Sequence, residues 1–137
     1  MKISPDAIIE IARHAEEGYP YEICGILIGP RGARRATRAV RARNTVTDRA
    51  GDRYEIDPRD LIRIQRETDA GGQDVIGYYH SHPDHPARPS IFDAERAWAG
   101  PIYVIVSCVR GEVVSTNGFV AGRDGGPFME EPLEVSE

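Results

Sequence analysis

The sequence VIGYYHSHPDHPARPSIFD, residues 75–93, holds an apolar run, paired histidines and an acidic residue within one short stretch. Residues 75–79 predict a buried strand, along which alternation aims His80 and His82 at one face while Ser81 points away. A proline-rich loop follows, and residues 90–98 then predict a helix that carries Asp93. The loop can fold this carboxylate back onto both histidines.

Two imidazole nitrogens and one carboxylate oxygen form a ligand set that suits a metal ion. A tetrahedral zinc ion held by three such ligands keeps a fourth position for water or substrate. Iron also binds two histidines and a carboxylate, so the residue types alone leave both metals open. The histidine pair is a weak indication by itself, because paired surface histidines are common.

The start of the predicted helix offers a competing interpretation of Asp93. Ser90 and Asp93 have the spacing of a capping box, in which the serine caps the first turn and the aspartate reaches back to the serine amide. On local grounds this spacing favours the cap over the metal ligand. An upstream residue, Glu22, reverses the preference.

Glu22 stands directly before the apolar run CGILIG, and the motifs HSHP and PSIFD follow downstream in that order. This pattern resembles the JAMM family, also called MPN-plus, of zinc-dependent isopeptidases, and the resemblance extends over nearly the whole chain. It implies zinc ligands, a general base that deprotonates the attacking water, and an oxyanion stabiliser. The zinc ligands would be His80, His82 and Asp93. Glu22 would be the general base, and Ser90 would be the oxyanion stabiliser.

The resemblance also implies a substrate class. Compact members of the family cleave ubiquitin-like proteins, including small sulfur carriers, at a peptide or isopeptide bond that follows a C-terminal Gly-Gly. Both trimming of an extension and release of a carrier from cysteine or lysine stay open. The alternative is a catalytically silent MPN scaffold, against which the intact motif residues count. A zinc deaminase would need an HxE motif together with a PCxxC motif, and the sequence contains no PCxxC.

The composition bounds the remaining possibilities. A chain of 137 residues fits one domain, residues 1–137, and 40% hydrophobic with 28% charged residues is ordinary for a globular protein. No apolar run approaches the roughly 20 residues that span a bilayer, so we expect no membrane partner. The start MKISPDAIIE predicts a helix instead of a signal peptide, which indicates the cytoplasm. The oligomeric state does not follow from the sequence.

The chain has a net charge of −5, and its charges are distributed unevenly. Six arginines lie within residues 31–43, and every charged residue after Arg123 is acidic. The arginines lack interleaved aromatic residues and the chain is acidic overall, which argues against nucleic acid. A solvated basic hairpin is one interpretation. The other is that this hairpin steers an acidic protein substrate toward the cleft.

Single residues outside the motifs have simpler interpretations. Cys24 and Cys108 lie in apolar runs and are expected to be core thiols, although a disulfide between them stays open. His14 is predicted to be a surface or core residue of the first helix, and His85 to be solvated. Trp98 is predicted to be a core aromatic residue of the third helix.

The remaining pattern predicts a single α/β domain with a mixed, largely antiparallel sheet flanked by helices. The family resemblance implies that the sheet is curled, akin to the deaminase architecture. Two further helices are expected at 5–18, capped by Ser4, and from Pro58 to about 71, capped by Asp57. Further strands are expected at 23–28, 36–44, 54–56, 102–109, 113–120 and 128–135.

Overall fold

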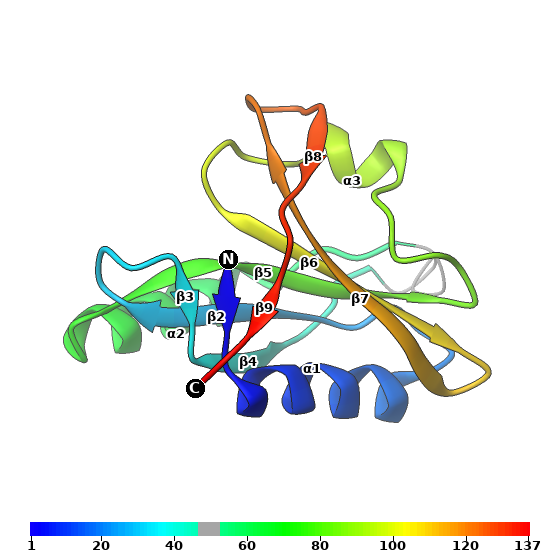
Figure 1. Ribbon diagram of the computed structural model, residues 1–137, viewed down its shortest axis with the longest axis horizontal. Coiled ribbons are helices and arrows are strands. Elements are labelled where there is room, and N and C mark those ends of the chain that lie inside the picture. The colour runs from blue at the N-terminus through cyan, green and yellow to red at the C-terminus, as the bar shows by residue number, and fades with distance from the viewer. Residues whose placement is uncertain (47–52) are drawn as a thin grey trace.

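A six-stranded sheet forms the centre of the computed structural model, which describes residues 1–46 and 53–137 (Figure 1). The strand order is β4-β2-β5-β6-β7-β8, in which β5 and β6 are parallel and all other neighbours antiparallel. The mixed, largely antiparallel sheet predicted from the sequence is therefore confirmed, and it is not closed. Its strands are β2 (Cys24–Pro30), β4 (Arg38–Ala42), β5 (Gln73–Pro83), β6 (Ile102–Val109), β7 (Glu112–Ala121) and β8 (Phe128–Glu130).

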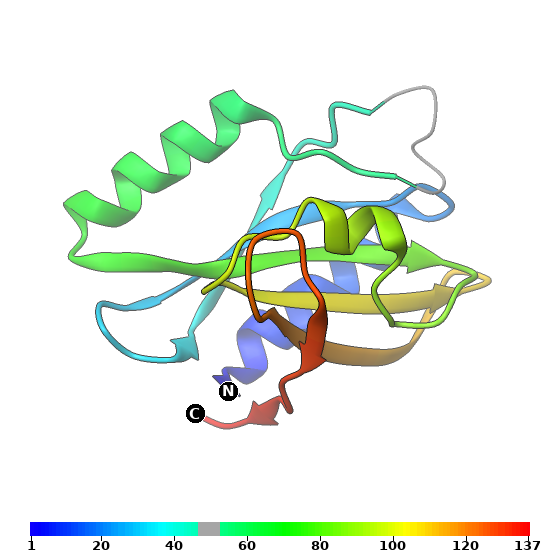
Figure 2. The same ribbon diagram turned by 90° about the horizontal axis from the view of Figure 1, so that it is seen from above.

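Two long helices cover opposite faces of this sheet (Figure 2). Helix α1 (Pro5–Gly18) begins after Ser4, whose hydroxyl accepts a hydrogen bond from the Ala7 amide at 3.2 Å. Helix α2 (Pro58–Ala70) begins after Asp57, whose carboxylate accepts from the Arg59 amide at 2.9 Å. Both predicted caps are confirmed.

Alternation along β2 decides which face each helix covers. Leu27 packs in the core that includes Ile11 of α1, while Ile26 and Ile28 pack with Ile64 of α2. The same alternation on β5 sends Tyr79 to the α1 face and its neighbours to the other face. The site described below lies on the face opposite α1.

A second, smaller sheet joins the two ends of the chain and was not predicted. Its order is β3-β1-β9, and all its strands are parallel and two residues long: β1 (Lys2–Ile3), β3 (Arg35–Ala36) and β9 (Glu134–Val135). The predicted edge strand 128–135 is therefore wrong as one element, because β8 pairs with β7 while β9 pairs with β1. Pro132 lies between them and has no amide hydrogen to continue a ladder.

The third helix is shorter than predicted. Helix α3 (Ile91–Glu95) ends before Trp98, whose side chain is 61% exposed, so the prediction of a core tryptophan is wrong. The Trp98 amide donates to the Tyr103 hydroxyl at 2.9 Å and the Ala99 amide donates to Asp124 at 2.9 Å. These tertiary partners take the amides that a longer helix would use.

The predicted strand 54–56 is also wrong as an element. Its only ladder contact among the described residues is a single bridge between Asn44 and Ile56. The Glu55 amide donates instead to the side-chain oxygen of Asn44 at 3.0 Å. A side chain therefore replaces the strand partner at this point.

Both cysteines are buried free thiols, as the simpler interpretation predicted. Burial raises the pKa of Cys24 to about 12, which keeps this thiol protonated and unreactive at neutral pH. Within the described ranges, the helices are too short or too polar to cross a membrane.

Candidate metal centre

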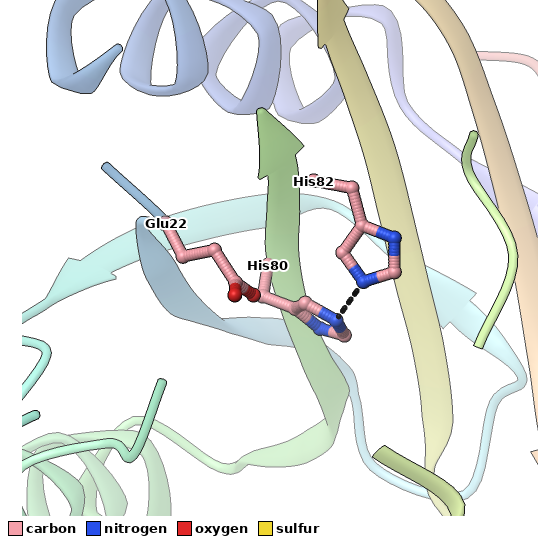
Figure 3. A group of neighbouring side chains, drawn as sticks. All are labelled: Glu22, His80 and His82. Carbon is pink, nitrogen blue, oxygen red and sulfur yellow. Dashed lines mark hydrogen bonds between the residues drawn. The ribbon is translucent and has the colours of Figure 1, made fainter. Parts of the chain in front are cut away.

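Two imidazoles lie side by side at the end of β5. The Nε2 atoms of His80 and His82 are 3.1 Å apart, and both side chains are buried. Strand β5 is hydrogen-bonded to β2 on one side and β6 on the other, so the backbone that carries both histidines is fixed. Figure 3 shows their rings and the Glu22 carboxylate turned toward one another. The alternation read from the sequence thus places both rings together.

Asp93 joins the two histidines from α3. Its Oδ2 atom lies 3.0 Å from Nε2 of His82 and 3.2 Å from Nε2 of His80. The same oxygen accepts a hydrogen bond from the Ser90 amide at 2.9 Å, and the Asp93 amide donates to the Ser90 hydroxyl at 3.0 Å. The capping box and the approach to the histidines therefore occur together, and the competition expected from the sequence does not arise.

This convergence of atoms fits a bound cation. Nδ1 of His82 lies 2.9 Å from the Pro86 carbonyl oxygen, which can only accept, so Nδ1 carries a proton. In the neutral ring Nε2 then points a lone pair at an Asp93 oxygen, and two lone pairs at this distance repel unless a positive charge lies between them. Ligand atoms about 2.0 Å from a tetrahedral zinc ion are about 3.3 Å apart, close to the spacing observed here.

The protonation states of two of these residues suit metal binding. Burial lowers the pKa of His80 and keeps its imidazole neutral. Burial acts against the charge of Asp93, but hydrogen bonds with both histidines outweigh it and hold the pKa of this carboxyl well below its usual range. Neutral imidazole and ionised carboxylate are the forms that bind metals.

The pKa of His82 also indicates that a positive charge is favoured between the imidazole and Asp93. Burial opposes its protonation, yet the hydrogen bond with Asp93 raises the pKa of His82. Without a metal, a proton on Nε2 is the positive charge that separates the two acceptors. A metal ion and this proton therefore compete for one position.

Glu22 lies beside the histidines, just before β2. It is 4% exposed, and a carboxylate oxygen lies within 4.8 Å of a ring nitrogen of each histidine. The next residue is tied to β5 twice: the Ile23 amide donates to the Ser81 hydroxyl and the Ser81 amide donates to the Ile23 carbonyl, both at 3.0 Å. Ser81, the residue between the two histidines, thus positions Glu22. This role was missed, and its only signal was a buried polar residue inside the motif.

An open pocket is lined by Glu22, His82 and Ser90. The Ser90 hydroxyl faces it while accepting from the Asp93 amide, and no described residue accepts its hydrogen. That hydrogen is therefore available to a bound substrate. Beyond Glu22, the other charged or titratable side chains lining the pocket are basic or imidazole groups: Arg53, His82, His85 and Arg88.

The arginine-rich hairpin lies mostly away from this pocket. Arg31 pairs with Asp74 at 3.4 Å, Arg34 with Glu131 at 2.8 Å, and Arg41 with two glutamates of α1. Pro30, at the hairpin tip, pairs with the first residue of β5, which precedes His80 by seven residues or about 23 Å along the strand. This arrangement favours the solvated hairpin over substrate steering.

Comparison with known proteins identifies the family of this chain. The family model for prokaryotic homologs of the JAB domain matches residues 4–118. A desampylase of Haloferax volcanii is 38% identical over 112 residues, which cover 78% of this chain and 80% of that protein. A CysO-cysteine peptidase of Mycobacterium bovis is 30% identical over 106 residues, or 77% and 71% of the two chains.

A solved structure shares the fold across both chains. It is described as a JAMM metalloprotease-like zinc site in the proteasome and signalosome, and it covers 100% of this chain and 98% of its own with a TM-score of 0.58 and 22% identity. Sequence, relatives and fold agree. The chain belongs to the prokaryotic JAB-domain branch of the JAMM, or MPN-plus, family and is a JAMM-type hydrolase.

Proposed function

We propose that this hydrolase cleaves the peptide or isopeptide bond that follows the C-terminal Gly-Gly of a ubiquitin-like or sulfur-carrier protein in the cytoplasm. Zinc would be held by His80, His82 and Asp93. The observation that carries the proposal is the convergence of three ligand atoms within 3.0–3.2 Å of one another beside a buried Glu22. The names of the relatives, a desampylase and a CysO-cysteine peptidase, support a protein-conjugate substrate.

The residues around the cluster supply the other groups that amide hydrolysis needs. Zinc, when bound, would supply a Lewis acid and lower the pKa of a coordinated water toward 7. The Glu22 carboxylate accepts a proton from the attacking water and returns it to the departing amine, so one residue acts as base and then as acid. The Ser90 hydroxyl donates its uncommitted hydrogen to the oxygen that gains charge as the carbonyl is attacked.

Zinc is preferred to iron because the Glu22 carboxylate lies next to the proposed ligands. A carboxylate that can move a proton serves hydrolysis, whereas the ligand set by itself fits either metal. Measurement of metal content and of activity after reconstitution with each metal tests this preference. Full activity with zinc alone is the expected result.

Cleavage is tested by incubating zinc-loaded protein with carrier proteins that bear extensions after Gly-Gly. Intact mass spectrometry should show loss of the extension, and neither chelator-treated protein nor Glu22→Gln should produce it. Extensions attached through an α-amine and through a lysine side chain distinguish trimming from isopeptide release. A protein that binds the carrier but leaves every extension intact with zinc present would instead be the silent scaffold.

A further inference from the structure

The two histidine rings of the cluster are held in different ways. Nδ1 of His82 is fixed by the Pro86 carbonyl at 2.9 Å, whereas Nδ1 of His80 is buried and has no hydrogen-bond partner among the described residues. Metal-binding histidines almost always donate their second N–H to a protein group or water, which fixes the ring orientation. His80 therefore lacks the usual restraint on its ring plane.

An aromatic ring packed on the face of the His80 imidazole can supply that restraint instead. The ring of Tyr54 is stacked on the imidazole of His80, with centroids 4.2 Å apart and an angle of 21° between the planes. A ring packed this closely opposes rotation of the imidazole about its χ2 bond and keeps water from one of its faces. The stack therefore restrains the same angle that a hydrogen bond at Nδ1 would.

The residues on either side of Tyr54 contact α3 and Arg96, the residue that ends this helix. The Arg53 guanidinium lies 4.5 Å from the centre of the Phe92 ring, and Glu55 pairs with Arg96 at 3.6 Å. Tyr54 is therefore held between two contacts to one short helical segment. Its ring is fixed relative to both β5 and α3, the two elements that supply the proposed ligands.

The side-chain amide of Asn44 links residues 53–55 to Glu22. Nδ2 of Asn44 donates to the Glu22 carbonyl at 3.1 Å and to the Arg53 carbonyl at 3.0 Å. Its Oδ1 atom accepts from the amides of Val46 and Glu55, each at 3.0 Å. Two donors and two acceptor sites are the full capacity of the side chain, and all four are used. The backbone of the proposed base and the segment under the His80 ring thus share one anchor.

We propose that Tyr54 is a positioning residue for metal binding. It sets the ring plane of His80, whose Nδ1 has no hydrogen-bond partner within residues 1–46 and 53–137, and Asn44 holds Tyr54 in position. This role goes beyond the proposed reaction and rests on it only through the assignment of His80 as a ligand. The phenol oxygen has no part in it, so the ring and not the hydroxyl carries the effect.

Zinc affinity tests the role of the ring. The dissociation constant is measured by chelator competition in Tyr54→Leu, which removes the stack, and in Tyr54→Phe, which keeps it. Loss of an outer partner of a metal ligand weakens binding by about 10–100-fold, so Tyr54→Leu should show this loss and Tyr54→Phe should stay within about threefold of the unchanged protein. The visible spectrum of cobalt-loaded protein should change only in Tyr54→Leu. Unchanged affinity in Tyr54→Leu, or equal loss in both variants, overturns the proposal.

Two further measurements keep the proposal falsifiable if Tyr54→Leu folds poorly. In the unsubstituted, metal-free protein the stacked ring should shift the proton resonances of the His80 imidazole upfield, and Tyr54→Phe should retain the shift; ordinary resonances in the folded protein overturn the stack. Asn44→Asp keeps the side-chain shape but replaces both donors, and it should weaken zinc binding in the same direction as Tyr54→Leu. Wild-type zinc affinity in Asn44→Asp contradicts the part assigned to Asn44.

His80→Ala separates this inference from the proposed function. If His80→Ala binds zinc as tightly as the unsubstituted protein, the ligand assignment itself fails, and the proposed reaction fails with it. If His80→Ala loses zinc while Tyr54→Leu keeps its affinity, only the positioning role fails. Unfolding midpoints of the metal-free proteins confirm that each variant is folded before its affinity is compared.

Discussion

Buried histidines lie on both faces of the central sheet, and the two faces treat them differently. On the α1 face, Nδ1 of His14 lies 2.8 Å from the Tyr79 hydroxyl, a group that can either donate or accept. On the opposite face, His80 and His82 share an aspartate oxygen that can only accept. Burial is common to all three rings. What distinguishes the candidate metal centre is the convergence of three possible ligand atoms, Nε2 of both histidines and Oδ2 of Asp93, within 3.0–3.2 Å of one another.

The largest effect is expected at Glu22, the carboxylate beside His80 and His82. Glu22→Gln keeps the side-chain shape but removes the group that accepts the proton, so turnover should fall by about 10²–10⁴-fold while bound zinc is retained. Steady-state cleavage and metal content measure the two quantities separately. Glu112→Gln, at an exposed position of β7, serves as the matched control. Normal turnover in Glu22→Gln would refute the base, and loss of zinc would make Glu22 a ligand.

A smaller loss of activity is expected at Ser90, the residue that caps the start of α3. Ser90→Ala removes the donor to the developing oxyanion and should lower kcat by at least about 100-fold. It also removes a helix cap, which costs about 1 kcal/mol of stability, so Ser90→Thr is needed as the variant that retains a hydroxyl for both roles. If Ser90→Ala loses stability but keeps its kcat, the serine is a cap and nothing more.

The positions of several side chains on the sheet face opposite α1 follow from local signals in the sequence. Alternation in one strand predicted that His80 and His82 lie on one face, and the spacing of Ser90 and Asp93 matched a capping box that the structure contains. The order of motifs added Glu22, which no local pattern selects. The first two features depend on neighbours in the chain, and short-range geometry is what periodicity reports.

The residues that hold the site in place could not be predicted in the same way. Asn44 makes hydrogen bonds to Glu22 and to the segment 53–55, which only the fold brings close to it. The ring of Tyr54 stacks on that of His80, which is also a tertiary contact. The end of α3 depends on where the amide of Trp98 finds an acceptor, which again is a tertiary partner. Two-residue strands such as β1 carry no periodicity at all.

The packing of the α1 face can be tested at Gly25. A methyl group there would overlap the ring and hydroxyl of Tyr79, which is fully buried and contacts His14. Gly25→Ala should therefore lower the free energy of unfolding by about 1–3 kcal/mol, measured by denaturant titration. Gly71→Ala is the control, because an added methyl there meets its nearest atoms at 3.6 Å. Equal stability of the two variants would show that the α1 face is loosely packed.

The smallest effect concerns the charge of His14. Burial, followed by the nearby Arg41 guanidinium, lowers the pKa of His14 from 6.5 to about 4. The unfolded chain therefore binds this proton first as the pH falls. The stability that the neutral ring contributes is complete above pH 6.5 and is lost progressively as the pH falls from 6.5 toward 4.

Between pH 7 and pH 5 this loss is at most about 2 kcal/mol by proton linkage, and His14→Gln, which does not titrate, should lack it. Denaturant unfolding of both proteins at several pH values measures the difference, in which the titration of His80 and His82 cancels. Parallel stability curves would contradict the lowered pKa. Zinc should leave the difference unchanged, because a cation on one face of the sheet replaces protons there and not on the other. A difference that varies with zinc would show that the two faces are coupled through Tyr79 and His80, which are adjacent on β5.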